Sequence, residues 1–275
     1  MKIAVIVHLY YTEMWHELAH CLRSFNDIDF DLFITTCSSS EDVRQMVCDE
    51  FPCVHYEVVE NRGYDIAPFI KVLNQLDLDK YDFIAKLHTK RNCAEWVNYC
   101  YMSEKAWRRC LLNPFSSKKS LARALKYFEK NKNVGMVASA PVVVRSGDYL
   151  ESEEIRKRAE SVISRLNLNP QERVFVAGTM FLVRAECLKV IQNKVSHIDF
   201  SILGDTEKLN KTHISDMSHV YERVFGYLIS AQNMSVSDYT LFGRCVIKFD
   251  IFRKYIFLFL RQFYRIMLKP LVLHK

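Results

Sequence analysis

The chain has 275 residues, of which 49% are hydrophobic and 25% are charged, so it can bury a sizeable core as an ordinary globular protein. Its formal net charge of +6 comes from residues 245–275, which hold seven of the 38 Lys and Arg residues but only one of the 32 Asp and Glu residues. The neutral remainder argues against a nucleic-acid-binding protein, whose basic excess would lie on a face of the fold, so we expect no nucleic acid partner.

The first half of the chain alternates between apolar runs of strand length and helical patterns. Strands are predicted at residues 2–9, 30–35, 54–59 and 81–87, and helices at residues 12–24, 43–51 and 66–76. Residues 38–41 have the sequence of a capping box at the start of the second helix. This alternation predicts an α/β fold with a Rossmann-type, mostly parallel sheet flanked by helices.

The second half is less regular. Helical patterns at residues 96–112 and 120–130 precede a predicted strand at 134–138, and a charged helix is predicted at 152–166. A single strand centred on Ala177-Gly178-Thr179 is expected over residues 173–183, and a helix over 220–230. Because we find no internal repeat and no Gly/Ser linker, we expect one domain over residues 1–244 and a tail over residues 245–275.

The tail combines seven aromatic residues with interspersed cations, a pattern typical of an amphipathic helix that binds anionic lipid. Its longest apolar run, Tyr255 to Leu260, is far shorter than the roughly 20 residues that cross a bilayer. A final helix packed on the domain is the alternative. The chain opens on a strand rather than a signal peptide, and its nine cysteines lack C-x-x-C spacing, which predicts buried thiols in a reducing cytosol. We therefore expect a cytoplasmic protein, peripheral on the inner face of the plasma membrane.

Two polar clusters follow the third and fourth predicted strands: Asn61-Arg62-Gly63-Tyr64-Asp65 and His88-Thr89-Lys90-Arg91. The carboxyl ends of parallel strands meet at one edge of a sheet, where open α/β folds bind ligands. The second cluster has the charge and hydroxyl group to neutralise a diphosphate, although a solvated basic turn has the same composition. Gly63 predicts a turn with positive φ, and Asp65 stands where an acid also caps a helix.

Two further patterns resemble metal sites. His16-Glu17-Leu18-Ala19-His20 matches the H-E-x-x-H pattern of zinc proteases, but it lies on the first predicted helix of a nucleotide-binding half, and a solvated helix face is the favoured interpretation. Asp77-Leu78-Asp79 resembles the D-x-D site of nucleotide-sugar enzymes. It precedes the fourth strand, at the end away from the polar clusters, where Asp commonly makes turn hydrogen bonds.

Five ordered segments carry a family resemblance: VHLYY, ENRGYDIAPF, YDFIAKLHTKR, FVAGTMFLVRAECL and HVYERVFGYLI. Over residues 4–230 the chain resembles the rhamnan-synthesis F family of bacterial polysaccharide glycosyltransferases. The resemblance implies a GT-A-like fold that transfers a sugar, often L-rhamnose from a dTDP donor, onto a lipid-linked or polysaccharide acceptor of an O-antigen, capsule or rhamnan. A non-catalytic subunit that binds sugar nucleotides or glycans in an assembly complex is the alternative.

The resemblance also implies roles for single residues. Donor contacts are expected from His8, Asn61, Arg62, Gly63, Asp65, His88, Thr89, Lys90, Arg91, Gly178 and Arg223. The cluster that begins at His88 stands where many GT-A enzymes have D-x-D, so no resident metal is expected, and Mg²⁺ or Mn²⁺ held by the donor diphosphate stays open. In the H-x-x-E-R segment, Glu222 is the expected general base of an inverting transfer, with His219 as its substitute or orienting partner. Arg223 is expected to point away from Glu222, and the alternative is that both are ordinary charges on a helix surface.

Overall fold

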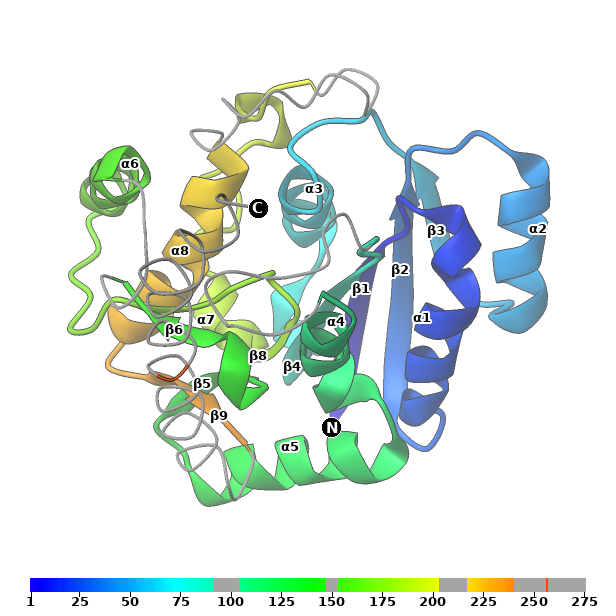
Figure 1. Ribbon diagram of the computed structural model, residues 1–275, viewed down its shortest axis with the longest axis horizontal. Helices are drawn as coiled ribbons and strands as arrows, with labels where there is room; N and C mark the ends of the chain where they lie inside the picture. Colours follow the sequence, from blue (N-terminus) through cyan, green and yellow to red (C-terminus); the bar gives the residue numbers. More distant parts are fainter. Residues whose placement is uncertain (92–103, 147–152, 203–216, 240–255, 257–275) are drawn as a thin grey trace, which may run out of the picture.

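A computed structural model describes residues 1–91, 104–146, 153–202, 217–239 and 256 (Figure 1). Its main sheet has seven strands in the order β3-β2-β1-β4-β8-β5-β9. The strands are β1 (Lys2–His8), β2 (Asp29–Thr36), β3 (His55–Val58), β4 (Phe83–His88), β5 (Val134–Ala138), β8 (Phe181–Arg184) and β9 (Ser235–Asp238). Only β8 runs antiparallel to its neighbours, β4 and β5. The expected α/β fold with a mostly parallel sheet flanked by helices is therefore confirmed.

The helices that were expected from the sequence pattern lie within a few residues of their predicted bounds where the structure describes them, and the short helix α7 was not expected. The described helices are α1 (Trp15–Leu22), α2 (Glu41–Glu50), α3 (Ile66–Gln75), α4 (Glu104–Leu112), α5 (Lys118–Lys130), α6 (Glu153–Arg165), α7 (Ala185–Leu188) and α8 (Met217–Ser230). The expected capping box at α2 does not form, because the side chain of its N-cap, Ser40, makes no capping hydrogen bond.

Of the described cysteines, Cys21 and Cys187 are buried, whereas Cys53 is exposed.

Helices α3 and α8 lie side by side near the middle of the molecule (Figure 1). Three aromatic rings hold them against the sheet: Phe69 of α3, Phe181 of β8 and Phe225 of α8 have centroids 5.5–6.2 Å apart. Helix α8 also approaches β7 (Val174–Val176) closely at Gly226, where an added Cβ would lie 2.0 Å from the Val174 carbonyl oxygen. This packing places the beginning of α8 next to the beginning of α3, beside the edge where β1 and β4 end.

The expectation of one strand over residues 173–183 is wrong. The chain forms β7, which pairs with β6 (Val143–Arg145), and then turns before β8 joins the main sheet. Gly178 has a φ of 80° and Thr179 a φ of 51°, and two consecutive residues in the left-handed region break a strand. The sequence hides the break because β7 and β8 are both apolar and largely buried.

Several expectations fall outside the described residues. The helix expected from residue 96 is described only from Glu104, and the tail over residues 245–275 is described only at Ile256. The division into a domain and a tail therefore remains a prediction. Among the helices of the described ranges, none is both long enough and apolar enough to cross a membrane.

Candidate active site at the carboxyl edge of the sheet

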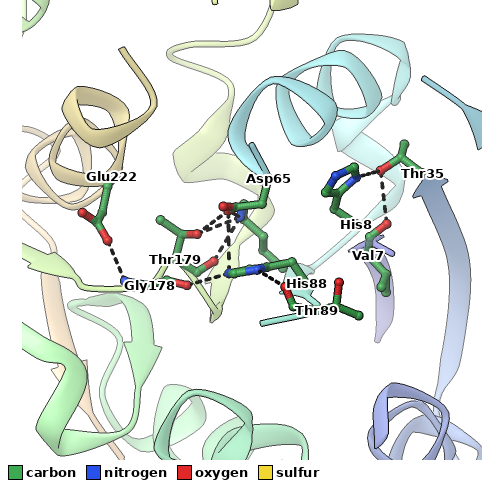
Figure 2. Close-up of polar contacts among 10 residues, drawn as sticks. Val7, His8, Thr35, Asp65, His88, Thr89, Gly178, Thr179 and Glu222 are labelled. Carbon is green, nitrogen blue, oxygen red and sulfur yellow. Dashed lines mark hydrogen bonds and ion pairs between the residues drawn. The ribbon is translucent and has the colours of Figure 1, made fainter. Parts of the chain in front are cut away.

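The ends of β1 and β4 bring two histidines together. His8 and His88 are the last residues of their strands and are direct neighbours in the parallel register. Asp65 immediately precedes α3, and the turn between β7 and β8 presents Gly178 and Thr179 to the same edge (Figure 2). The structure thus gathers residues from four distant segments at the edge where the sequence predicted a ligand site.

Lys86 connects three of these segments. Its side chain is only 1% exposed, although it lies within a strand, and its ammonium group donates to the Oδ2 atom of Asp65. It also lies 3.2 Å from the carbonyl oxygen and 2.9 Å from the Oγ1 atom of Thr179. The Thr179 hydroxyl in turn donates to Asp65 Oδ2. The three protons of the ammonium group therefore meet three oxygen acceptors, and the buried charge is fully hydrogen-bonded.

Asp65 does not cap α3, although its position suggested that role. Its side chain makes no capping hydrogen bond and instead accepts from Lys86 and Thr179. Burial by itself would raise the pKa of Asp65, but the nearby charges of His88 and Lys86 and the two hydrogen bonds outweigh it and hold the pKa well below its usual range. Asp65 is thus a fixed anion, and its side chain remains 18% exposed.

His88 lies between carbonyl groups. Its Nε2 atom is 2.9 Å from the carbonyl oxygen of Gly178, and its Nδ1 atom is 3.1 Å from that of Thr89. Burial lowers the pKa of His88, although the carboxylate of Asp65 opposes the shift. A neutral ring can donate to only one of the two carbonyl groups, whereas a protonated ring can donate to both.

His8 is a neutral imidazole that donates through Nδ1 and can accept through Nε2. Its Nδ1 atom lies 3.1 Å from Thr35 Oγ1, and that hydroxyl donates to the Val7 carbonyl oxygen, so the proton on His8 must be at Nδ1 (Figure 2). Burial lowers the pKa of His8 to about 3. The Nε2 atom therefore carries a lone pair at neutral pH, next to the end of β4.

The turn before α3 has the expected conformation, with a φ of 59° at Gly63. The guanidinium of Arg62 is hydrogen-bonded within the protein. Its Nε atom lies 2.9 Å from Glu60 Oε2, and its Nη1 atom lies 2.6 Å from the carbonyl oxygen of Phe200 and 3.4 Å from that of Ile198. Asn61 has a long contact, 3.5 Å, with the hydroxyl group of Tyr10. Arg62 therefore anchors the segment around Phe200 to this edge.

The side chains that follow β4 also contact other segments of the chain. Thr89 Oγ1 accepts hydrogen bonds from the backbone nitrogens of Tyr10 and Tyr11, at 3.0 and 2.9 Å. The Lys90 ammonium lies 4.7 Å from the ring centroid of Trp107, and Arg91 pairs with Glu13 and lies over the ring of Tyr11. Thr89 thus holds the loop after β1 in place, while Lys90 and Arg91 lie at the border of this edge of the sheet.

Glu222 reaches this edge from α8. Its Oε1 atom accepts a hydrogen bond from the backbone nitrogen of Gly178 at 2.6 Å, and its Oε2 atom lies 2.5 Å from the guanidinium of Arg223. The expectation that Arg223 points away from Glu222 is wrong. The long arginine side chain folds back over the ring of Phe175, 4.7 Å from its centroid, and also donates to the carbonyl oxygen of His219.

His219 lies one turn before Arg223 on α8. Its ring packs edge-on against Tyr64 of the turn before α3, with centroids 5.9 Å apart. Its Nδ1 atom is buried and has no hydrogen-bond partner among the described residues. His219 thus joins the same edge as Glu222, as the sequence expected, although the two side chains have different partners.

Sequence reasoning missed Lys86 and Thr179 as site residues. The signal for Lys86 was present, because a lysine inside the otherwise apolar strand FIAKLH must bury its charge against a partner. No comparable signal marks Thr179, whose role depends on the turn between β7 and β8.

The two metal-like patterns lie elsewhere. His16 and His20 are exposed on α1, and Glu17 pairs with Arg108 at 3.2 Å. Within the described ranges, no three His, Cys, Asp or Glu residues are grouped so that they could hold a metal ion. Asp77 accepts a hydrogen bond from the backbone nitrogen of Asp79 in the turn before β4, which confirms the interpretation as a local turn.

Comparisons with known proteins place this geometry in context. Residues 1–234 match the family described as rhamnan synthesis protein F. The uncharacterized protein WxcX, from two strains of Xanthomonas campestris pv. campestris, is 20% identical over 226 residues, which are 82% of this chain and 31% of WxcX. The chain therefore spans about a third of the length of these curated relatives.

Solved structures show more distant similarity. Residues 1–349 of S. aureus TarS in complex with UDP-GlcNAc are 14% identical, with a TM-score of 0.43 over 86% of this chain and 56% of that chain. The 4-diphosphocytidyl-2C-methyl-D-erythritol synthase of Anaerococcus prevotii is 9% identical, with a TM-score of 0.38 over 92% of this chain and 96% of that chain.

Proposed function

The chain belongs to the rhamnan synthesis protein F family, and we propose from this that it is a glycosyltransferase of bacterial cell-surface polysaccharide synthesis. The observation that carries the proposal is the extent of the family match, which covers residues 1–234 and therefore every strand of the main sheet except β9. The acceptor is a lipid-linked or polysaccharide glycan, and dTDP-L-rhamnose is the first donor to test.

The arrangement of the edge supports a nucleotide-sugar donor. A donor of this kind carries hydroxyl groups that need acceptors and a diphosphate that needs cations. His8 and Asp65 are acceptors at the ends of β1 and before α3, and Lys90 and Arg91 are cations at the border of the same edge. Because Arg62 is already hydrogen-bonded to two carbonyl groups, we assign the diphosphate contact to Lys90 first.

For an inverting transfer, Glu222 is the proposed general base. It would take the proton of the acceptor hydroxyl while that oxygen attacks the anomeric carbon and the diphosphate leaves with the bonding electrons. Each oxygen of Glu222 accepts one hydrogen bond in the structure, so each retains a lone pair for a proton. His219 is the alternative base, since its Nδ1 atom is buried without a partner among the described residues.

The metal requirement is a separate part of the proposal. In the family resemblance the position of the D-x-D carboxylates holds His88 to Arg91, of which Lys90 and Arg91 are cations suited to contact a diphosphate directly. Activity that persists in EDTA supports direct neutralisation of the diphosphate by the protein. Activity that EDTA abolishes and Mn²⁺ restores supports a divalent ion held by the donor.

The proposal for location rests on the tail. Residues 245–275 combine cations with seven aromatic residues, a composition suited to an anionic membrane surface. We propose that this segment holds the protein on the inner face of the plasma membrane, next to a lipid-linked acceptor.

A thermal-shift screen across UDP-, GDP-, dTDP- and CMP-sugars tests donor binding, because a ligand that binds the folded state raises the melting temperature. The donor that gives the largest shift is then incubated with the protein, and release of nucleoside diphosphate is measured with and without a glycan acceptor. Stabilisation followed by release supports a glycosyltransferase. Stabilisation without release or transfer supports the non-catalytic binding subunit, and the absence of any shift contradicts both.

A further inference from the structure

The buried pair of Lys86 and Asp65 is not explained by stability alone. Removing two charges from water costs several kcal/mol for each, and well-packed apolar side chains in place of such a pair are often at least as stable. Lys86 nevertheless occupies the core of the sheet, where its strand neighbours Ala85 and Leu87 are at most 1% exposed. The site therefore keeps a charged pair where an apolar residue would pack, and the reason must lie in what the pair holds in place.

The hydrogen bonds to Asp65 are one-sided. Lys86 and Thr179 both donate to Oδ2, and His88 Nε2 lies 3.8 Å from the same oxygen (Figure 2). No described residue donates a hydrogen bond to Oδ1. Lys86 is 1% exposed and Thr179 4% exposed, whereas Asp65 is 18% exposed, so the carboxylate is the part of this network that a ligand can reach. Within the described part of the chain, Oδ2 anchors the side chain and Oδ1 keeps its lone pairs for a hydrogen bond from a ligand.

The charge of Asp65 decides which ligand group it takes. An ionised carboxylate only accepts hydrogen bonds and repels a diphosphate, whose oxygens also only accept. Its partner in a nucleotide sugar is therefore a hydroxyl group or an N–H group of the nucleobase. The lowered pKa of Asp65 agrees with this role, since a carboxylate that stays ionised is a poor general base but a lasting acceptor.

The turn between β7 and β8 indicates which of these donor groups lies nearest to Asp65. Gly178 contacts Glu222 through its backbone nitrogen, and the next residue, Thr179, contacts Asp65 through its hydroxyl. Two consecutive residues thus connect Asp65 to the proposed base, which must act next to the anomeric carbon. This places Asp65 beside the sugar that is transferred rather than beside the nucleobase.

Resting on the proposed function, we propose that Asp65 accepts a hydrogen bond through Oδ1 from a hydroxyl group of the transferred sugar. Lys86 and Thr179 are positioning residues that hold the carboxylate at the sheet edge. They act on the donor only through Asp65.

Calorimetric titration of the full chain with dTDP and dTDP-L-rhamnose, and with UDP and UDP-glucose, tests the contact. Asp65→Asn is expected to bind the nucleotide sugar at least about tenfold more weakly than the parent does, which is the scale of one lost charged hydrogen bond. Its affinity for the matching nucleoside diphosphate should stay within about twofold of the parent's. Asp79→Asn, which changes an exposed carboxylate before β4, is the control and should bind both ligands like the parent.

Each outcome has a distinct meaning. Equal weakening for the diphosphate and the nucleotide sugar would move the contact to the ribose or base and overturn the assignment to the transferred sugar. Unchanged affinity in Asp65→Asn, with a parent that binds, would overturn the inference and leave the proposed function standing. A parent that binds neither nucleotide sugar contradicts the proposed function, and this inference with it.

A double-mutant cycle tests the positioning role. If Lys86 acts through Asp65, the double variant Lys86→Met/Asp65→Asn binds the nucleotide sugar no more weakly than Asp65→Asn and melts at a higher temperature than Lys86→Met. Losses of affinity that add would show that Lys86 acts independently and would refute the role. Should Lys86→Met fail to fold, Thr179→Ala replaces it in the cycle. It must then weaken binding of the nucleotide sugar selectively, because equal binding to the parent would also refute the role.

Discussion

Lys86→Met is expected to destabilise the protein in a way that depends on pH. The substitution leaves Asp65 without its ammonium partner, and breaking a buried pair in this manner costs about 3–5 kcal/mol. Asp65 keeps the Thr179 hydrogen bond and is 18% exposed, so we expect the lower end of that range, about 3 kcal/mol, at pH 7. Lys80→Met, at a lysine that is 70% exposed before β4, is the control and should change stability by less than about 0.5 kcal/mol.

The sign of the pH dependence follows from Asp65. In the parent its pKa is lowered, so the stability it contributes is present above its unfolded pKa of about 4 and is lost as the pH falls towards the folded pKa. Burial raises the pKa of Asp65, and in Lys86→Met one of the two charges and one of the two hydrogen bonds that oppose it are gone, so the folded-state pKa is higher than in the parent. The ionised carboxylate then contributes less stability at neutral pH than it does in the parent, and the difference disappears as the pH falls and the group is protonated. The loss in free energy of unfolding caused by Lys86→Met should therefore become smaller as the pH falls. Both proteins retain His88.

Urea unfolding followed by circular dichroism at pH 7 and pH 4 measures this penalty in both proteins. One pKa unit corresponds to about 1.4 kcal/mol, so we expect the penalty to fall by more than about 1 kcal/mol between the two pH values. A penalty below about 1 kcal/mol at pH 7, or one that is equal at both pH values, would refute the description of Lys86 and Asp65 as a buried, ionised pair.

Four further substitutions and one deletion test the proposed site and tail. Glu222→Gln should leave donor binding intact and reduce turnover about 100-fold or more, as measured by nucleoside diphosphate release; near-normal turnover with a collapse in His219→Ala would transfer the role of base to the histidine. Lys90→Ala should weaken donor binding by about 1.5–3 kcal/mol in calorimetry without lowering the melting temperature, whereas Arg62→Ala should lower the melting temperature, because it removes the contacts to Ile198 and Phe200. Deleting residues 245–275 should move the protein from the membrane to the soluble fraction and abolish binding to anionic liposomes; a full-length protein that ignores such liposomes would contradict the membrane proposal.

The sequence predicted the first half of the fold well because its signals are local. Apolar runs such as residues 2–9 and 81–87 mark strands buried on both faces, and their alternation with amphipathic helices restricts the sheet to a parallel arrangement. The same logic placed the segments that begin at Asn61 and His88 at one edge. It also explains why Asp77, which lies at the opposite end of β4, could be excluded as part of a metal site at this edge.

The second half depends on contacts between distant residues, which a local pattern does not show. The turn at Gly178 and Thr179 divides an apolar stretch that resembles one strand, and the glycine in its centre was compatible with either conformation. Arg223 points towards Glu222 because Phe175, from a different segment, gives its guanidinium a surface to lie on. A helical pattern on α8 alone predicts the opposite direction.

The roles of single residues were the least accessible. Arg62 had the composition of a phosphate ligand, but its guanidinium binds carbonyl groups of residues 198 and 200, more than a hundred positions away. Lys86 carried a recognisable signal, a charge inside a buried strand, whose partner could be identified only after α3 and the turn at Thr179 were placed against β4. Sequence patterns thus located the edge of the site, while the structure assigned its hydrogen bonds.

The most direct test of the central claim is the release of nucleoside diphosphate from dTDP-, UDP-, GDP- and CMP-sugars by the full chain, with a glycan acceptor present, in parent and Asp65→Asn proteins. We predict that the parent releases the diphosphate from one class of donor. Asp65→Asn is expected to do so at least about tenfold more slowly at donor concentrations below saturation. Absence of release by the parent from every donor would contradict the proposed function, and an Asp65→Asn variant as active as the parent would contradict the contact between Asp65 and the transferred sugar.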